Sequence, residues 1–312
     1  MGLKQSKTDS QQNGAPQPLI IENSPAIDFS KTVILEPQRY NNTTRNWEKI
    51  TTNHVDIKQK TLKFVTYNVW FETEMIDRRM PALFQLLEQE NADVICLQEV
   101  LPRFIKALCE QQWVRNNYVV SDCLGFTCMS YGVAILTKIP SVTQMKLIPT
   151  DSGMGRKLLE LEFRINQANV KVGTLHFESL NHSDLRRDQL ILSCNELTTE
   201  CAHSFLLGDF NFGEQHTEEE KSLSEIALEK GWKDTWKVLK PDEPGNTIDV
   251  NYPHPYWKPA RFDRVLVKSD CWLPSSVCLI GNHSLGLSES GNKIFPSDHI
   301  GLVAEFVWKD ES

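Results

Sequence analysis

The 312-residue chain lacks any apolar run close to the roughly 20 residues that a membrane-spanning helix needs. Its first residues are polar and lack the apolar centre of a secretory signal. We therefore expect an intracellular protein, located in the nucleus, the cytoplasm or both.

The eight cysteines form no C-x-x-C pair and no zinc-finger spacing with histidine, which argues against structural zinc and favours reduced thiols. An excess of cations is also lacking. The formal net charge of -8 argues against a protein that coats nucleic acid non-specifically. Local recognition of a phosphate stays open, because it needs only a few well-placed cations. The 40% of hydrophobic residues is enough for a packed core.

The first 55 residues are rich in Gln, Asn, Ser, Thr and Pro and show no sustained hydrophobic period. This composition predicts a disordered leader, residues 1–55, before one catalytic domain, residues 56–312. The leader begins Met-Gly-Leu-Lys-Gln-Ser, which matches the N-myristoylation pattern with Gly2 as the acylated residue. An acylated Gly2 would give a membrane-associated fraction, although one acyl chain binds a bilayer only marginally. The alternative is a mobile tail.

Short β-rich segments alternate with turns and a few helical stretches after the leader. This order predicts two sheets packed face to face with helices outside. The predicted helices are 76–87, with Pro81 marking its start or a kink, Pro102–Gln112, Ser183–Thr199 with Ser183 as N-cap, and Thr217–Lys230, ended by Gly231. The predicted strands are residues 63–69, 93–99, 132–137, 157–163, 170–175, 204–210, 264–269 and 299–308.

Polar side chains stand at or next to the ends of several of these strands: Asn68, Glu99, His176 and Asp209. Taken singly, each has a structural explanation as a turn residue, a helix-start carboxylate or a core histidine. Taken together, the segments TYNVWFE, LQEV, GDFNFGE and FPSDH supply the residue types that hold a hard cation and hydrolyse a phosphate ester. The joint pattern favours a catalytic site.

These segments resemble the core motifs of the endonuclease/exonuclease/phosphatase superfamily across about residues 62–308. The resemblance implies an α+β fold, a four-layer α/β/β/α sandwich of the DNase I type. The matching core residues are Asn68, Gln98-Glu99, Gly208-Asp209-Phe210-Asn211 and Ser297-Asp298-His299. Similarity to the tyrosyl-DNA phosphodiesterase 2 branch comes from Gly155-Arg156-Lys157-Leu158-Leu159, His176-Phe177-Glu178-Ser179, Arg186 with Gln189, and Arg261-Phe262-Asp263-Arg264.

The sequence departs from this branch at Thr247-Ile248-Asp249, where the branch has Thr-Trp-Asp. Without that ring, the grip on a single-stranded end weakens, since stacking contributes about 1–3 kcal/mol per base. Other rings that could replace it are Trp70, Tyr252, Tyr256 and Trp257.

The expected cofactor is Mg²⁺, with Mn²⁺ as the alternative ion. Magnesium usually takes one or two carboxylates together with water and substrate phosphate. Glu99 is the expected main ligand, and the resemblance adds Asn68 and places Asp298 near the metal.

The expected catalytic residues complete a hydrolytic site. Asp209 would accept the proton of the attacking water, and Asn211 would donate a hydrogen bond to the phosphoryl oxygens. Their spacing in an extended segment points both side chains into one cleft. His299 would stabilise transition-state charge as an imidazolium, and the resemblance makes Asp263 its partner. Expected substrate contacts are His176, Ser179, Arg186 and Arg156, with structural hydrogen bonds as the alternative role.

The resemblance implies hydrolysis of 5′-phosphotyrosyl-DNA to leave a 5′-phosphate, as in repair of topoisomerase adducts. The partner would be single-stranded or 5′-end DNA, and the protein a monomer. Within the superfamily, abasic DNA, RNA, an inositol phosphate and sphingomyelin stay open as substrates, because loops rather than fold decide them. Outside enzymes, the alternative is an inactive scaffold, which the five filled core positions argue against.

Overall fold

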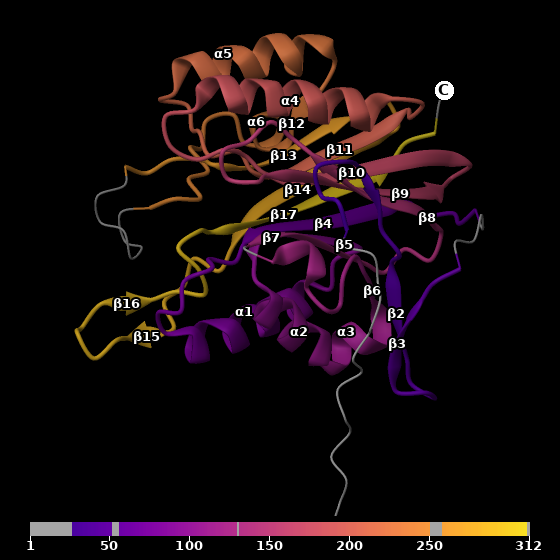
Figure 1. Ribbon diagram of the computed structural model, residues 1–312. Coiled ribbons are helices and arrows are strands. Elements are labelled where there is room, and N and C mark those ends of the chain that lie inside the picture. Colours follow the sequence, from indigo (N-terminus) through magenta and orange to yellow (C-terminus); the bar gives the residue numbers. More distant parts are fainter. Residues whose placement is uncertain (1–26, 52–55, 130, 250–257, 311–312) are drawn as a thin grey trace, which may run out of the picture.

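The computed structural model describes residues 27–51, 56–129, 131–249 and 258–310, and these form four layers (Figure 1). Helices α4 (Ser183–Thr198) and α5 (Thr217–Ile226) cover the first sheet. The second sheet packs against its other face and is covered in turn by α1 (Ile76–Glu90), α2 (Pro102–Glu110) and α3 (Gln112–Asn117). The expected α/β/β/α sandwich of the DNase I type is confirmed.

The first sheet has the strand order β1-β8-β9-β10-β11-β13-β12. Its strands are β1 (Val33–Ile34), β8 (Val142–Pro149), β9 (Lys157–Ile165), β10 (Ala168–His176), β11 (His203–Asp209), β13 (Asp263–Lys268) and β12 (Lys233–Asp234). The short helix α6 (Thr235–Leu239) follows β12 directly.

The second sheet has the order β14-β17-β4-β5-β7-β6-β2-β3. Its strands are β14 (Trp272–Ile280), β17 (Gly301–Trp308), β4 (Thr61–Asn68), β5 (Val94–Val100), β7 (Gly132–Thr137), β6 (Val119–Val120), β2 (Gln38–Asn41) and β3 (Asn46–Lys49). A separate hairpin, β15 (Gly286–Leu287) with β16 (Lys293–Ile294), projects from the body beside α1 (Figure 1).

Within the described strands, each of the two large sheets contains one parallel pair, β10 with β11 and β4 with β5. Parallel neighbours need a long crossover, which α4 supplies in the first sheet and α1 in the second. Both strands of a parallel pair end at the same edge of their sheet. The carboxyl ends of the two pairs are therefore the places to look for a site.

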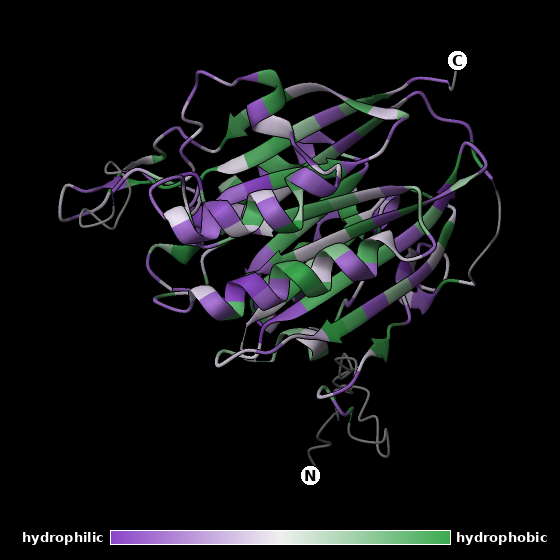
Figure 2. Cartoon of the chain, turned by 90° about the horizontal axis from the view of Figure 1, so that it is seen from above, coloured by the Kyte–Doolittle hydropathy of each residue, from purple (hydrophilic) through white to green (hydrophobic). Residues whose placement is uncertain are grey.

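Apolar side chains fill the space between the layers. Between the sheets, the Phe205 ring packs on Phe64 and Phe306, with ring centroids 4.6 Å and 5.0 Å apart. Figure 2 shows the polar residues of the outer helices lying over strands that are largely hydrophobic. Among the described residues, no helix combines the length and apolar character needed to cross a bilayer.

The predicted boundary of the leader at residue 55 is wrong. Residues 33–49, which we assigned to that leader, form β1, β2 and β3. Strand β1 pairs with β8, and β2 pairs with β6, so these strands extend an edge of each sheet. They are short and only half-buried, and they carry no apolar alternation that the sequence could reveal.

Several helix ends differ from the prediction. Helix α1 begins at Ile76, ahead of Pro81. The N-cap of α4 is His182 rather than Ser183, and its side chain makes no capping bond. The predicted helix over Pro102–Gln112 ends at Glu110, where α3 takes over. The helix over 217–230 divides into α5 and a 3-10 turn at Leu228–Lys230, and Gly231 ends it at φ 91° as predicted.

Candidate active site

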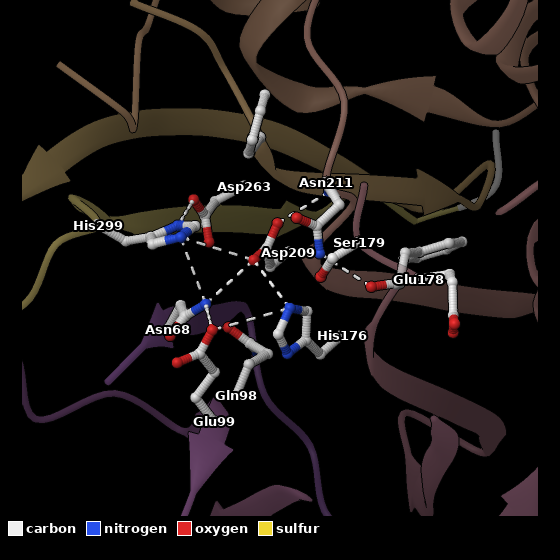
Figure 3. Close-up of polar contacts among 12 residues, drawn as sticks. Asn68, Gln98, Glu99, His176, Glu178, Ser179, Asp209, Asn211, Asp263 and His299 are labelled. Carbon is white, nitrogen blue, oxygen red and sulfur yellow. Dashed lines mark hydrogen bonds and ion pairs between the residues drawn. The ribbon is translucent and has the colours of Figure 1, made fainter. Parts of the chain in front are cut away.

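Polar side chains end the strands of both parallel pairs and meet between the two sheets (Figure 3). Asn68 is the last residue of β4, and Glu99 lies at the end of β5. His176 and Asp209 are the last residues of β10 and β11. The two crossovers thus bring four predicted residues from separate segments into one buried cluster.

Three of the site residues stand side by side across the first sheet. His176 on β10 pairs with Asp209 on β11, which pairs with Asp263 on β13. A side chain has no room just before this row, since a Cβ on Gly208 would lie 2.0 Å from the carbonyl oxygen of Leu175 on β10. Glycine at 208, with φ 149°, is therefore needed to seat Asp209 in the row.

Asn68 links the two sheets. Its Nδ2 lies 3.0 Å from Oε1 of Glu99 and 3.0 Å from Oδ2 of Asp209. Its Oδ1 accepts a hydrogen bond of 3.0 Å from the backbone N–H of Trp70. In this geometry the Asn68 amide nitrogen donates to both carboxylates. The role of Asn68 as a metal ligand stays a prediction.

Glu99 holds its carboxylate in a buried position with few partners. Its backbone has φ 58°, and its Oε2 accepts from the N–H of Phe71 at 3.1 Å. Burial, and then the negative charge of Asp298, raise the pKa of Glu99 to about 7. A carboxylate destabilised in this way is suited to a cation, which would offset both effects.

The His176 ring is kept neutral by burial and by Arg156, which contacts its Nδ1. Nη1 of Arg156 lies 2.9 Å from Nδ1, so this nitrogen must accept and the ring proton sits on Nε2. Nε2 lies 3.3 Å from Oδ2 of Asp209. Burial and the charges of Arg156 and His299 lower the pKa of His176 well below its usual value.

His299 has the opposite environment. Its Nδ1 is 2.8 Å from Oδ2 of Asp263, and its Nε2 is 3.6 Å from Oδ2 of Asp209. Burial alone would lower the pKa of His299, but the carboxylates of Asp263 and Asp209 outweigh it and raise this pKa well above its usual value. The site therefore contains one neutral and one protonated histidine on either side of Asp209.

Asp209 and Asn211 both line the pocket, although the reason differs from the expected one. Asn211 has φ 55°, so the segment is not extended. Its backbone N–H donates to Oδ1 of Asp209 at 2.8 Å, which forms a tight turn, and its Nδ2 donates to the carbonyl of Phe177 at 2.8 Å. Burial raises the pKa of Asp209 to about 6, against the effect of His299.

The candidate substrate contacts divide into two kinds. Arg156 donates to Ser179 through Nη2 at 2.9 Å, in addition to its bond with His176. Arg186 instead donates to the carbonyls of Glu178 and Leu180 and pairs with Glu219. These contacts engage the Arg186 guanidinium with the loop that follows β10. A role in holding this loop therefore fits Arg186 better than the predicted contact with phosphate.

A pocket of about 390 Å³ opens over this cluster. It also contains residues that we did not predict, although Gln215 and His216 follow the GDFNFGE segment directly and their position was a usable signal. The pocket is lined by Glu99, His176, Ser179, Leu180, Asn181, Asp209, Asn211, Gln215, His216, Ile248, Lys258, Phe262 and His299.

The aromatic residues predicted to stack on a base, and Gly2, are not among the described residues that line this pocket. Trp70 is buried with the guanidinium of Arg79 4.2 Å from its ring centroid, so it is not available for stacking. The other ring candidates, Tyr252, Tyr256 and Trp257, and the acylation candidate Gly2 lie outside the described residues.

The family model described as the Endonuclease/Exonuclease/phosphatase family matches residues 65–299. The chain belongs to this family. Its enzymes are hydrolytic nucleases and phosphatases that typically depend on a divalent metal. Among curated proteins, none matches the chain closely enough to count as a relative.

Solved structures of family members share the fold of this chain. TDP2 from D. rerio, complexed with a single-strand DNA product, is 23% identical with a TM-score of 0.66, covering 80% of this chain and 99% of that one. Truncated TDP2 from Caenorhabditis elegans is 24% identical with a TM-score of 0.66 and the same coverage. A family protein from Bacteroides thetaiotaomicron is 15% identical with a TM-score of 0.61, covering 80% of this chain and 98% of that one. At these identities, the likeness establishes the fold alone.

Among the residues that the structure describes, two groups of three side chains could hold a metal ion, because their ligand atoms lie within 4.8 Å of one another. The first group is Glu99, His176 and Asp209, and the second is Asp209, Asp263 and His299. In the second group, the hydrogen bond to Asp263 already uses Nδ1 of His299. The first group contains the buried Glu99 carboxylate, whose raised pKa Asp298 increases further. Oxygen ligands of this kind fit a hard divalent cation at Glu99.

Proposed function

We propose that the protein is a divalent-metal-dependent phosphodiesterase that removes tyrosine adducts from 5′ ends of DNA and leaves a 5′-phosphate. The observation that carries the hydrolytic part is the convergence of Asn68, Glu99, Asp209 and His299 on one pocket. Support for the substrate comes from the branch-like segments around Arg156 and Ser179, and from the DNA product bound to TDP2, tyrosyl-DNA phosphodiesterase 2, of D. rerio.

In this proposal, Asp209 is the general base. With a pKa of about 6, the Asp209 carboxylate is ionised at neutral pH. This pKa is also close to neutral pH, which lets the carboxylate accept a proton efficiently. The neutral His176 and Asn68 donate toward its Oδ2, which fixes the carboxylate in one orientation. Asn211 lies beside it and retains one amide hydrogen for a phosphoryl oxygen.

His299 stabilises the negative charge that builds up on phosphorus-bound oxygens. It is suited to this because Asp263 keeps it protonated and orients Nε2 toward the pocket. Magnesium held at Glu99, with Asp298 nearby, would add charge stabilisation on the phosphoryl oxygens when bound. Asn68 would then orient Glu99 and Asp209 relative to each other.

Incubation with Mg²⁺ and single-stranded DNA carrying a 5′-phosphotyrosyl group tests the proposal. Parallel reactions contain an abasic duplex, poly(A), an inositol phosphate and sphingomyelin. We expect the tyrosyl linkage to be cleaved fastest, leaving a 5′-phosphate, with loss of the reaction in EDTA and in Glu99→Ala. Faster cleavage of another ester would retain the phosphodiesterase and reject the tyrosyl-DNA substrate. No hydrolysis of any ester would favour the scaffold alternative.

A further inference from the structure

The loop between β6 and β7 holds three large apolar side chains in solvent. Leu124 is 41% exposed, Phe126 52% and Met129 72%. Single exposed apolar residues are ordinary, but three within six positions of one loop are a concentration that points to an apolar partner. We call residues 122–129 the apolar loop.

The shape of the apolar loop is fixed from within. The carboxylate of Asp122 accepts from the N–H groups of Leu124, Gly125 and Thr127 at 2.9, 2.8 and 2.7 Å, and from the Thr127 hydroxyl at 2.9 Å. A Cβ on Gly125 would lie 2.6 Å from Cα of Pro102, so the loop packs tightly on α2. The exposed side chains are therefore displayed by a firm backbone.

The chain enters the described structure on the same side of the molecule. Lys157 and Thr127 line one small pocket, and Nζ of Lys157 lies 5.6 Å from the ring centroid of Phe29. Residues 1–26, which begin with the acylation pattern at Gly2, thus join the body near the apolar loop. At up to about 3.5 Å per residue, a segment of this length is long enough for Gly2 to reach the same bilayer surface as the apolar loop.

We propose that the apolar loop inserts into the interfacial region of a lipid bilayer and acts together with a fatty acid on Gly2. One acyl chain binds membranes with a constant of only about 10⁴ M⁻¹, so stable attachment needs a second element. The sequence supplies no basic cluster beside Gly2. The apolar loop is this second element. Membrane attachment of this kind is a property beyond phosphodiester hydrolysis.

The charges around the loop indicate how the bilayer is bound. Arg103 and Lys106 are exposed on α2 beside the loop, but Arg103 holds the carbonyl of Phe71, next to the exposed Glu72. Because the signs are mixed, electrostatic attraction contributes little and apolar insertion dominates. We therefore expect similar binding to neutral and anionic vesicles and weak dependence on salt.

Insertion also positions the active site. Tyr131 follows the loop, stacks on Phe71 at 5.1 Å between ring centroids, and lies 6.0 Å from the ring of His176. The loop and the catalytic cluster are joined through these rings. A membrane-bound enzyme would therefore work with this side of its pocket near the bilayer surface.

Co-sedimentation of the full chain with vesicles tests the proposal. The chain is produced with an N-myristoyltransferase, and acylation is checked by mass spectrometry. A chain that the transferase leaves without a fatty acid on Gly2 would overturn the proposal. Vesicles are phosphatidylcholine with and without phosphatidylserine. The test variant is Leu124→Ser/Phe126→Ser/Met129→Ser, and the matched control is Val238→Ser/Leu287→Ser/Val307→Ser, at exposed apolar positions elsewhere.

We expect the loop variant to bind both kinds of vesicle at least about tenfold more weakly than the wild type, because affinity follows buried apolar area. The control variant should bind like the wild type, and both variants should unfold at wild-type temperature. Equal binding of the loop variant and the wild type would overturn the proposal, and would be the result if another protein or residues 1–26 cover the loop. Absence of vesicle binding by the acylated wild type would overturn it as well.

Discussion

The carboxylate of Asp263 lies 2.8 Å from Nδ1 of His299, and it is the main reason that this buried histidine is protonated. The raised pKa of His299 means that its stabilising contribution is complete below the usual value of 6.5 and is lost as pH rises through the folded pKa. Catalysis that needs the imidazolium should decline over the same alkaline range.

Replacing Asp263 with Asn should therefore move the alkaline limb of the pH–rate profile to lower pH, because the carboxylate that raises the pKa of His299 is gone. The measurement is kcat against pH with saturating metal, and Asp270→Asn, at an exposed carboxylate, is the control. An unmoved alkaline limb would show that protonated His299 is not required.

Glu99 should couple metal binding to stability. Its pKa is raised from 4.5 to about 7, so its ionisation opposes folding as pH rises from the unfolded value through the folded one. We expect Mg²⁺ to raise the unfolding temperature more at pH 8 than at pH 6. At pH 8, metal-free Glu99→Gln should be more stable than metal-free wild type by on the order of 2 kcal/mol.

Calorimetry with and without Mg²⁺ measures this, and Glu72→Gln, at an exposed carboxylate, is the control. A Glu99→Gln protein that Mg²⁺ stabilises as much as the wild type would exclude Glu99 as the main ligand.

Replacing Asp209 with Asn should separate activity from stability. The variant should lose about 10²–10⁴-fold in kcat, because the base is gone. Its metal-free form should be at least as stable as the wild type at pH 8, since burial disfavours the ionised Asp209. Turnover and thermal unfolding are compared with Asp188→Asn, at an exposed carboxylate. Near-normal turnover would assign the base elsewhere.

Gly208→Ala should destabilise the fold by at least about 3 kcal/mol, because the new methyl group would meet the Leu175 carbonyl and force β10 and β11 apart. Gly291→Ala is the matched control: it also has a positive φ, of 82°, but nothing lies within 4 Å of its added Cβ. Urea unfolding compares the two. Similar losses would mean that backbone strain rather than the close approach decides the need for glycine at 208.

The residues that the sequence identified best are those at strand ends. Asn68, Glu99, His176 and Asp209 each follow an apolar run, and the two crossovers bring them together. The local pattern also predicted eight strands that are present. Strand β14 was not predicted, since Pro274, Ser275 and Ser276 interrupt its apolar character and its pairing with β17 decides its structure.

Side-chain roles were harder to predict, because they depend on partners far along the chain. From the sequence, Arg186 could bind a phosphate or hold a loop. Its contacts with Glu219 and with the carbonyl group of Glu178 favour the second role. The amide of Asn68 could offer oxygen or nitrogen, and the neighbouring Trp70 N–H decides which faces the carboxylates. Strand β1, within residues 33–49, pairs with β8, which lies more than a hundred residues further along the chain. Neither composition nor periodicity reveals such pairing.

The row of His176, Asp209 and Asp263 across three adjacent strands makes activity a sensitive measure of refolding. A shift of one position between β10 and β11 would turn Asp209 away from the pocket and present Gly208 or Phe210 instead. Such a misaligned chain would retain most of its circular dichroism and compactness. Recovered turnover would therefore count only the molecules whose strands had paired correctly.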